Sequence, residues 1–461
     1  MQTRLFCSAF SASLLLLQLP TTVQAQKISK QLDVLTASYA KAGQFNGTVL
    51  VAEKGKVVFA KGYGLANREW DQPNAPDTKF RLGSLTKQFT SMLVMQLVEK
   101  GQLKLDAHIT DYLPDYPKAG GDKITLHHLL THTSGIPNYT AQPNFRNGPS
   151  IQPTTPVAFV STFSAMPLEF EPGSKFNYSN SGYFLLGAIV EKVTGKPYAQ
   201  VLTENILQPL HMQDTGYDLA GTILPKRATG YEKTPTGMAN SAYLDMTVPY
   251  AAGSLYSTVL DLYKWDQALY TNQLLSETNK ALLFKDFKSG YAYGWNIGKS
   301  PMGPDTVAVQ QHGGGINGFR TFLLRAPKDH HLVVVLDNES GPKVPQLSAD
   351  LLKVLYRQPA TGPKPEPVAP KAIAVDAATL AGYVGKYALA PTFILTVTVE
   401  NAQLYVQATG QPRFGLVPTA AGRFFAASVP AELEFVKKPS GEVEKVILHQ
   451  GGKDSPGAKI E

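Results

Sequence analysis

Cysteine is almost absent from this chain, because its 461 residues include a single one, Cys7. Cys7 lies in an N-terminal stretch that carries one positive charge at Arg4, an apolar run at residues 14–17 and the small residue Ala25 at its end. This order is typical of a secretory signal peptide, and we expect cleavage after Ala25. Removal of residues 1–25 leaves a chain with no disulfide, no thiol nucleophile and no cysteine-based metal site.

Long hydrophobic runs are also missing. The apolar part of the N-terminal stretch is nearer about ten residues than the roughly 20 that a membrane-spanning helix needs. No later stretch is continuously apolar over that length. We therefore expect no integral membrane segment, and an exported protein that is located in the periplasm or outside a bacterial cell.

A strong charge of one sign is the third missing feature. The formal net charge is +7, 17% of the residues are charged, and the basic residues are scattered along the chain. Scattered basic residues indicate a solvated surface, so we expect no nucleic-acid partner. A hydrophobic fraction of 43% is ordinary for a folded protein, and the length is ample for two domains.

The most informative stretch is Arg81 to Lys87, which is followed by a helix-patterned run at residues 88–100. Apolar residues recur there at spacings of three and four, at Leu85, Phe89, Met92, Leu93 and Leu97. Ser84 stands at the N-terminal end of this helix, beside its free N–H groups and the positive end of its dipole. Lys87, three residues on, projects from the same face. The stretch therefore combines a nucleophile with a base in one helical turn.

Two observations limit what this spacing proves. A serine before an apolar helix is most often only an N-cap, which is the alternative interpretation of Ser84. The pattern Ser-x-x-Lys also occurs at residues 38–41 and 340–343. The spacing becomes informative only when partner residues occur elsewhere in the chain.

Two later stretches supply candidate partners. Tyr178 and Asn180 lie on a loop directly ahead of a helix-patterned run that closes at Gly195. Asn180 could also cap that helix. Residues 312–318 read His-Gly-Gly-Gly-Ile-Asn-Gly between two strand-like runs. Such glycines permit close approach of a backbone or a ligand, and a plain hairpin loop is the alternative.

Three histidines within six residues, His127, His128 and His132, suggest a metal site. No His-Glu-x-x-His pattern accompanies them, so we expect helix-packing and capping roles and no bound metal.

A proline-rich segment at residues 358–375 reads as a stiff linker between two domains. The preceding domain, residues 26–357, opens with a helix at residues 27–44 and a β-hairpin. Residues 376–461 contain short strand-like runs that predict a small all-β barrel or sandwich. These runs are Phe393 to Glu400, Gln403 to Ala408, Arg413 to Pro418, Arg423 to Ala427, Glu432 to Lys437 and Glu442 to His449.

Taken in order, Ser84-Leu85-Thr86-Lys87, Tyr178-Ser179-Asn180 and His312-Gly313-Gly314 resemble the motifs of the serine β-lactamase-like superfamily. The nearest branch holds class C β-lactamases, D-alanyl-D-alanine carboxypeptidases, D-aminopeptidases and related esterases. The resemblance implies an α+β fold, with an antiparallel sheet flanked by helices and a helical subdomain beside it. The C-terminal region is similar to a lipocalin-like β domain.

The resemblance also implies the roles of individual residues. Ser84 would be the acylated nucleophile, while Lys87 and Tyr178 would share general-base and general-acid work. Asn180 would hydrogen-bond Lys87 and the substrate amide, and the N–H groups of Ser84 and Gly315 would form the oxyanion hole. We expect proximity of Lys87 and Tyr178 to lower a pKa, so that one of them can accept the serine proton. No metal or organic cofactor is implied.

The third motif departs from the class C pattern, in which Lys-Thr-Gly stands where this chain has His312-Gly313-Gly314. The change removes a fixed positive charge and a hydroxyl that would bind a substrate carboxylate. We therefore expect an exported serine hydrolase that acts on a small-molecule or peptide substrate, such as a D-amino-acid peptide or a carboxylic ester. The alternatives are a β-lactamase proper and an inactive module that binds cell-wall peptide.

Overall fold

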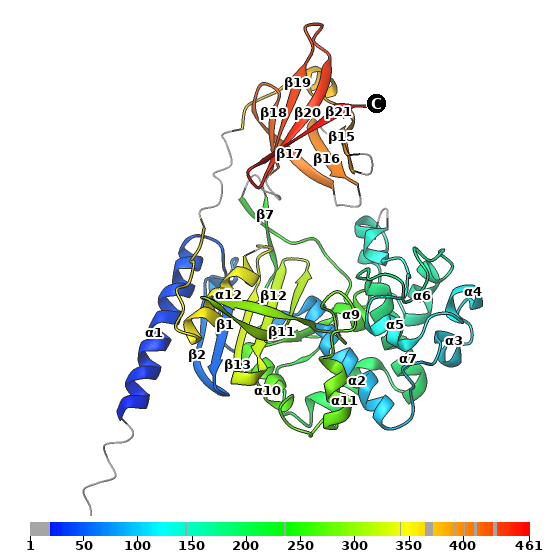
Figure 1. Cartoon of the computed structure of the whole chain (residues 1–461), viewed down its shortest axis with the longest axis vertical. Coiled ribbons are helices and arrows are strands. Elements are labelled where there is room, and N and C mark those ends of the chain that lie inside the picture. The colour runs from blue at the N-terminus through cyan, green and yellow to red at the C-terminus, as the bar shows by residue number, and fades with distance from the viewer. Residues whose placement is uncertain are drawn as a thin grey trace, which may run out of the picture. The chain divides into compact units, whose positions relative to one another are not determined.

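The computed structural model describes residues 19–142, 145–234, 237–341, 343–364, 372–390, 393–400, 402–409, 413–426 and 431–461. The chain divides into two compact units, Met1–Pro363 and Lys364–Glu461, which are coloured from blue to yellow and from yellow to red in Figure 1. Most of the predicted signal peptide, residues 1–18, lies outside the described residues. No helix in the described ranges is both long and apolar enough to cross a bilayer.

A six-stranded antiparallel sheet forms the centre of the first unit, in the order β10-β11-β12-β13-β1-β2. The strands are β1 Gly47–Glu53, β2 Lys56–Tyr63, β10 Asn296–Met302, β11 Asp305–Ile316, β12 Phe319–Ala326 and β13 His331–Asp337. Every residue of β13 is buried, because this strand lies inside the sheet and helices cover both faces. Its nearly continuous apolar sequence follows from that position.

One face of the sheet is covered by α1 (Leu19–Lys41) and α12 (Val344–Leu355), which pack against each other in Figure 1. They bury Ile28 and Leu32 of α1 and Leu351 of α12 against the valines of β1 and β13. The helix predicted at residues 27–44 therefore exists, but it begins earlier, at Leu19.

The opposite face carries α2 (Thr86–Glu99) and α10 (Val259–Ala268), which continue into a helical region. The remaining helices of that region are α3 Ile109–Tyr112, α4 Lys118–Gly121, α5 Leu126–Leu130, α6 Pro156–Ser164, α7 Asn180–Thr194, α8 Tyr198–Leu202, α9 Tyr250–Gly253 and α11 Glu277–Leu283. Aromatic rings such as Phe159, Phe184 and Tyr250 hold it together. This helical region beside an antiparallel sheet confirms the predicted fold class of the first unit.

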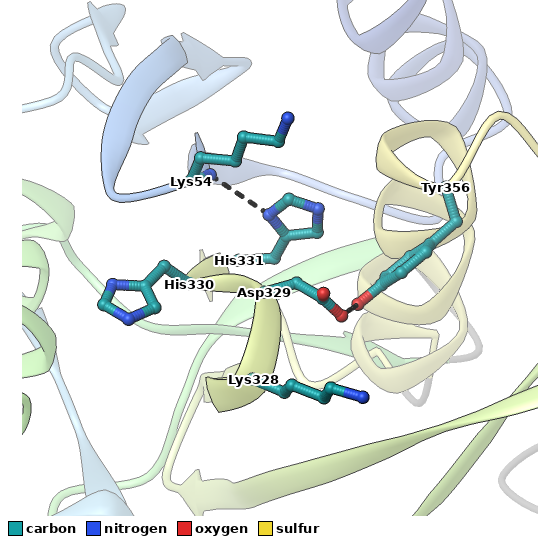
Figure 2. A pocket seen from close by; sticks show the side chains of 6 residues that line it. All are labelled: Lys54, Lys328, Asp329, His330, His331 and Tyr356. Carbon is teal, nitrogen blue, oxygen red and sulfur yellow. Dashed lines mark hydrogen bonds between the residues drawn. The ribbon is translucent and has the colours of Figure 1, made fainter.

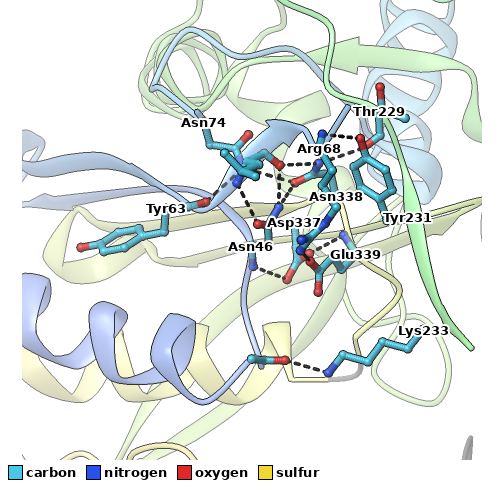
Figure 3. A network of polar contacts seen from close by, with 12 residues as sticks. Asn46, Tyr63, Arg68, Asn74, Thr229, Tyr231, Lys233, Asp337, Asn338 and Glu339 are labelled. Carbon is cyan, nitrogen blue, oxygen red and sulfur yellow. Dashed lines mark hydrogen bonds and ion pairs between the residues drawn. The ribbon is translucent and has the colours of Figure 1, made fainter. Parts of the chain in front are cut away.

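Short strands connect these parts. They are β3 Leu65–Asn67 with β4 Gln72–Pro73, β5 Phe80–Arg81 and β6 Gly216–Tyr217 on either side of β9 Leu255–Ser257, and β7 Tyr231–Thr234 with β8 Gly237–Asn240. Figure 3 shows a polar network at the end of β13, where Asn338 Nδ2 donates to the carbonyls of Leu65 and Thr229. Asn338 thereby fixes three separate chain segments at one end of the sheet.

The second unit is a closed barrel of eight antiparallel strands, preceded by α13 Ala377–Ala381. Its strands are β14 Gly385–Ala390, β15 Phe393–Glu400, β16 Gln403–Ala408, β17 Arg413–Ala420, β18 Arg423–Ala426, β19 Ala431–Lys437, β20 Val443–Gln450 and β21 Lys453–Lys459. Alternating residues point inward, and the rings of Tyr383, Phe424 and Phe435 pack on one another inside. The predicted barrel is confirmed, although the sequence analysis missed its first and last strands.

Candidate active site

Ser84 lies on a short 3-10 helix, Gly83–Leu85, that leads directly into α2. Gly83 adopts a left-handed φ of 55°, which glycine tolerates without strain. Neither helix has a side-chain cap among the described residues. The Ser84 hydroxyl therefore does not cap the helix, contrary to the alternative interpretation, and instead faces Lys87.

Lys87 is completely buried, and its Nζ atom has three partners. Nζ lies 3.1 Å from Ser84 Oγ, 2.8 Å from Asn180 Oδ1 and 2.9 Å from the carbonyl oxygen of Ala252. Burial disfavours the charged form and holds the pKa of Lys87 well below that of an exposed lysine. Three separate parts of the chain therefore converge on one lysine that readily loses its proton.

The chemistry of these partners determines what Lys87 can do. Asn180 Oδ1 and the Ala252 carbonyl can only accept hydrogen bonds. A neutral amine donates its two N–H groups to them. Its lone pair then faces Ser84 Oγ, whose O–H group donates to it. The geometry suits removal of the serine proton.

Tyr178 lies beside this pair, with its ring centroid 4.8 Å from Lys87 Nζ. The Tyr178 hydroxyl is buried and has no hydrogen-bond partner among the described residues. Burial raises the pKa of Tyr178, and the nearby Ser84 hydroxyl offsets this only in part. The expectation that mutual proximity lowers the pKa of either residue is therefore wrong for Tyr178. Burial, rather than Tyr178, lowers the pKa of Lys87.

Asn180 is the first residue of α7, and its side chain binds Lys87 instead of capping the helix. Asn138, which the sequence analysis missed, fixes this orientation. Its Oδ1 atom accepts from the Asn180 backbone N–H at 3.2 Å and from Asn180 Nδ2 at 3.3 Å. Asn138 follows Gly135-Ile136-Pro137, a turn signal that gave no sign of this contact.

The glycines after His312 belong to β11, which continues to Ile316, so the plain hairpin loop is wrong. A Cβ atom on Gly314 would lie 1.9 Å from the Leu82 carbonyl oxygen, and one on Gly83 would lie 2.9 Å from the Gly315 nitrogen. Only glycine allows the strand to approach the Ser84 turn this closely. The Gly315 amide is thereby brought next to the nucleophile's turn.

His312 is only 4% exposed, and both of its ring nitrogens are engaged within the protein. Nδ1 donates to the Gly313 carbonyl at 2.6 Å, so Nε2 accepts from the Tyr291 hydroxyl at 3.1 Å. Burial and the nearby Lys87 lower the pKa of His312 to about 4. The imidazole is therefore neutral near pH 7, and its role in substrate binding stays a prediction.

Arg320 is a second residue that the sequence analysis missed. It pairs with Gly315 across the β11–β12 ladder, and its Nη1 atom lies 3.0 Å from where a Gly315 Cβ would be. Within the described part of the chain its guanidinium makes one hydrogen bond, to the Phe319 carbonyl at 3.1 Å. A half-buried cation with unused donors therefore lies beside the Gly315 amide.

The histidine block performs structural tasks. His128 caps α5, because its Nδ1 accepts from the Thr125 N–H and its own N–H donates to Thr125 Oγ1. His127 packs on Phe287 and shares a hydrogen bond of 2.8 Å with Tyr293. These contacts match the predicted packing and capping roles.

Other candidate groups lie elsewhere. Ser38, of the second Ser-x-x-Lys match, donates to the Leu35 carbonyl within α1. Figure 2 shows a cavity of about 380 Å³ lined by Lys54, His331 and Tyr356. His331 is the first residue of β13, and Asp337, which pairs with Arg320 of β12 in the sheet, is the last. This cavity therefore lies at the end of β13 that is away from Arg320.

Comparison with known proteins gives the family. Residues 32–357 match the family model described as Beta-lactamase, and residues 369–458 match a Domain of unknown function (DUF3471). Penicillin-binding protein 4* of Bacillus subtilis strain 168 is 30% identical over 462 residues, which cover 94% of this chain and 99% of that protein.

Two solved structures are also similar to this chain. A penicillin-binding protein of Bacillus halodurans has 29% identity and a TM-score of 0.61, over 70% of this chain and 97% of that chain. The octameric penicillin-binding protein homologue of Pyrococcus abyssi has 25% identity and a TM-score of 0.63, over 93% and 99%. The chain therefore belongs to the Beta-lactamase family and carries a C-terminal DUF3471 domain, which forms the eight-stranded barrel.

Proposed function

We propose that this protein is a serine hydrolase that forms an acyl-enzyme on Ser84. The observation that carries the proposal is the buried Lys87 amine, held 3.1 Å from Ser84 Oγ by two acceptor-only partners. A serine hydroxyl is a weak nucleophile until a neighbouring base takes its proton. Burial lowers the pKa of Lys87, which makes its unprotonated amine more available as such a base.

In the first step, the Ser84 proton moves to Lys87 Nζ while Oγ forms a bond to the substrate carbonyl carbon. The N–H groups of Ser84 and Gly315 stabilise the resulting oxyanion, which lowers the barrier by about 3 kcal/mol for each donor. The Tyr178 phenol, with its raised pKa, relays a proton from Lys87 to the departing oxygen or nitrogen. Water then releases the acyl group by the reverse proton path.

The substrate we propose is an amide or ester that carries a carboxylate near the scissile bond, such as a peptide that ends in D-Ala-D-Ala. The neutral His312 supplies no positive charge. The Arg320 guanidinium, beside Gly315 and with unused donors, is suited to a carboxylate. This feature favours a carboxypeptidase-type substrate over a neutral ester.

Labelling tests the nucleophile. Exposure to a fluorophosphonate and to a labelled penicillin should add one probe mass at Ser84. Ser84→Ala should abolish both the labelling and the hydrolysis of p-nitrophenyl butyrate. Ser38→Ala, which changes the Ser-x-x-Lys pattern at residues 38–41, is the matched control. It should retain both the labelling and the hydrolysis. An intact mass that stays unchanged after long exposure to both probes would contradict the proposal.

A pair of substrates tests the carboxylate. The kcat/KM ratio between a D-Ala-D-Ala peptide and its C-terminal amide should fall about tenfold or more in Arg320→Gln, because charge-assisted hydrogen bonds contribute about 1.5–3 kcal/mol. Arg357→Gln removes the same charge from a residue that pairs with Glu53, and its ratio should match the wild type. An unchanged ratio in Arg320→Gln would refute this role.

Two alternative functions give different outcomes when nitrocefin is added to these substrates and probes. A β-lactamase would hydrolyse nitrocefin faster than any ester or peptide. An inactive module would bind cell-wall peptide without turnover and without labelling of Ser84.

We also propose that the protein is exported after removal of residues 1–25. N-terminal sequencing of the periplasmic and secreted fractions of a bacterial host should give a chain that starts at Gln26. Full-length chain confined to the cytoplasm would contradict export.

A further inference from the structure

His132 lies behind Tyr178 and is completely buried. The two ring centroids are 4.1 Å apart, the shortest of four aromatic contacts that the imidazole makes. The other three rings belong to Phe176, Tyr183 and Tyr291. The alternative interpretation is that His132 only fills space in the hydrophobic core.

The hydrogen bonds of His132 are more specific than that interpretation requires. Its carbonyl oxygen accepts from the Asn177 N–H at 2.9 Å, and its Nδ1 atom accepts from the Ser179 N–H at 3.2 Å. One residue therefore holds the backbone on both sides of Tyr178. These are the bonds that determine where the Tyr178 ring lies.

Keeping histidine at this position is costly. Its backbone φ is +56°, in the left-handed region that few residues other than glycine adopt and in which histidine, like asparagine and aspartate, is enriched. Because Nδ1 accepts, the proton of a neutral ring is on Nε2, and Nε2 is buried with no partner in the described ranges. A buried donor without a partner destabilises the folded state. Strain and an unpaired group of this kind cluster at functional sites.

The charge of His132 is set by the same environment. Burial and the neighbouring Lys87 and His312 hold the pKa of His132 well below that of an exposed histidine. The ring is therefore neutral, with Nδ1 free to accept from Ser179. Protonation of Nδ1 would break that bond.

We propose that His132 is a positioning residue that holds the Tyr178 phenol against Ser84 and Lys87. The inference rests on the proposed function, because it matters only if Tyr178 transfers a proton during acylation. It predicts that the effect of changing His132 passes through Tyr178. A residue that only fills the core would act independently of Tyr178.

A double-mutant cycle tests this dependence. The measured quantity is the second-order rate of Ser84 labelling by a fluorophosphonate, together with kcat and KM for p-nitrophenyl butyrate. His132→Phe should lower the labelling rate and kcat about tenfold or more, with little change in KM, because misplacement by about 1 Å can cost up to a hundredfold. In a Tyr178→Phe background the same change should cost less than about twofold. Equal losses in both backgrounds would overturn the proposal.

His127→Phe is the matched control, since His127 is a ring-packed histidine of the same block that binds Tyr293 instead. Any loss of labelling rate that His127→Phe causes should be the same in the wild type and in the Tyr178→Phe variant. If His132→Phe does not fold, His132→Leu, which also lacks an acceptor for the Ser179 N–H, replaces it in the cycle with the same expected coupling. Wild-type protein that never labels at Ser84 would refute the proposed function itself, whereas a labelled wild type with an additive cycle would refute only the role of His132.

Discussion

At the scale of single residues, burial shifts the pKa values of the side chains in this site. Lys87 and His312 are both enclosed, and both have a pKa below the ordinary value of their side chain. Tyr178 is shifted upward by the same desolvation. Burial thus favours the unprotonated amine of Lys87, which can accept a proton, and keeps the Tyr178 phenol protonated, so that it has a proton to pass on.

The pH dependence of acylation should follow Lys87. The rate of Ser84 labelling should rise as Lys87 loses its proton and then level off, with a midpoint well below 10.5, because burial lowers this pKa. Rates of labelling measured between pH 5 and 10 give the midpoint. Lys87→Met should remove the rise and reduce the rate by about a thousandfold. A midpoint at or above the ordinary lysine value would contradict this assignment.

His312 should make the first unit acid-sensitive. Its pKa is about 4 in the folded state and 6.5 as an ordinary histidine, so between these values the unfolded chain binds more protons. The free energy of unfolding should therefore fall as the pH drops from 6.5 to 4, by about 3 kcal/mol in total.

His312→Gln keeps a donor and an acceptor but cannot titrate. Its free energy of unfolding should fall less between pH 7.5 and 4.5 than that of the wild type. Urea unfolding followed by tryptophan fluorescence reports on this unit, because all three tryptophans, Trp70, Trp265 and Trp295, lie in it. The same pH dependence in both proteins would show that His312 does not contribute.

At the scale of elements, β11 joins the sheet to the nucleophile. Gly313, Gly314 and Gly315 continue the strand to Ile316, and Thr321 on β12 donates to the Leu82 carbonyl at 2.7 Å. The sheet thereby supports the turn that carries Ser84. A sequence of three glycines cannot show whether it forms a loop or a strand, because glycine adopts both conformations readily.

Gly314→Ala should separate β11 from the Ser84 turn. Its new methyl group would lie 1.9 Å from the Leu82 carbonyl oxygen and 2.2 Å from Thr321 Oγ1. We expect a loss of about 3 kcal/mol or more in the free energy of unfolding, together with slower labelling of Ser84. Gly298→Ala on β10, where a Cβ meets nothing within 4 Å, is the control. Equal stability of the two variants in urea titrations would argue against the close packing.

At the scale of the whole molecule, the end of the first unit lies later than the sequence indicated. Residues 358–375 were predicted to be a linker, yet Thr361 and Gly362 donate their N–H groups to Asp350 at 3.1 and 2.9 Å. Asp350 also accepts from the Tyr39 hydroxyl at 2.8 Å. The Tyr39 hydroxyl also lies 3.1 Å from the Gly362 carbonyl oxygen, so the first part of the proline-rich segment binds both α12 and α1.

Two truncations test this boundary. A chain that ends at Pro363 should remain monodisperse and should label at Ser84 as fast as the full chain. A chain that ends at Gln358 should be less stable by about 1–3 kcal/mol, because Asp350 loses two backbone donors. Urea unfolding of both fragments gives the difference. Aggregation of the longer fragment would instead show that the barrel covers part of its core.

The sequence by itself determined the order of the motifs, the presence of two domains and the identity of the candidate nucleophile and base. Ser84 and Lys87 are three residues apart where a 3-10 turn runs directly into α2, so local geometry alone brings them together. Alternation of apolar residues likewise identified most strands of the barrel.

Only the tertiary structure decided how the distant parts meet. Asn138 and Arg320 lie far from Ser84 in the chain and belong to no recognisable motif, so only folding brings Asn138 to Asn180 and Arg320 to Gly315. The pKa shifts of Lys87 and Tyr178 also follow from enclosure by segments that are remote in sequence. Burial is a property of the whole fold, and a local pattern of residues cannot specify it.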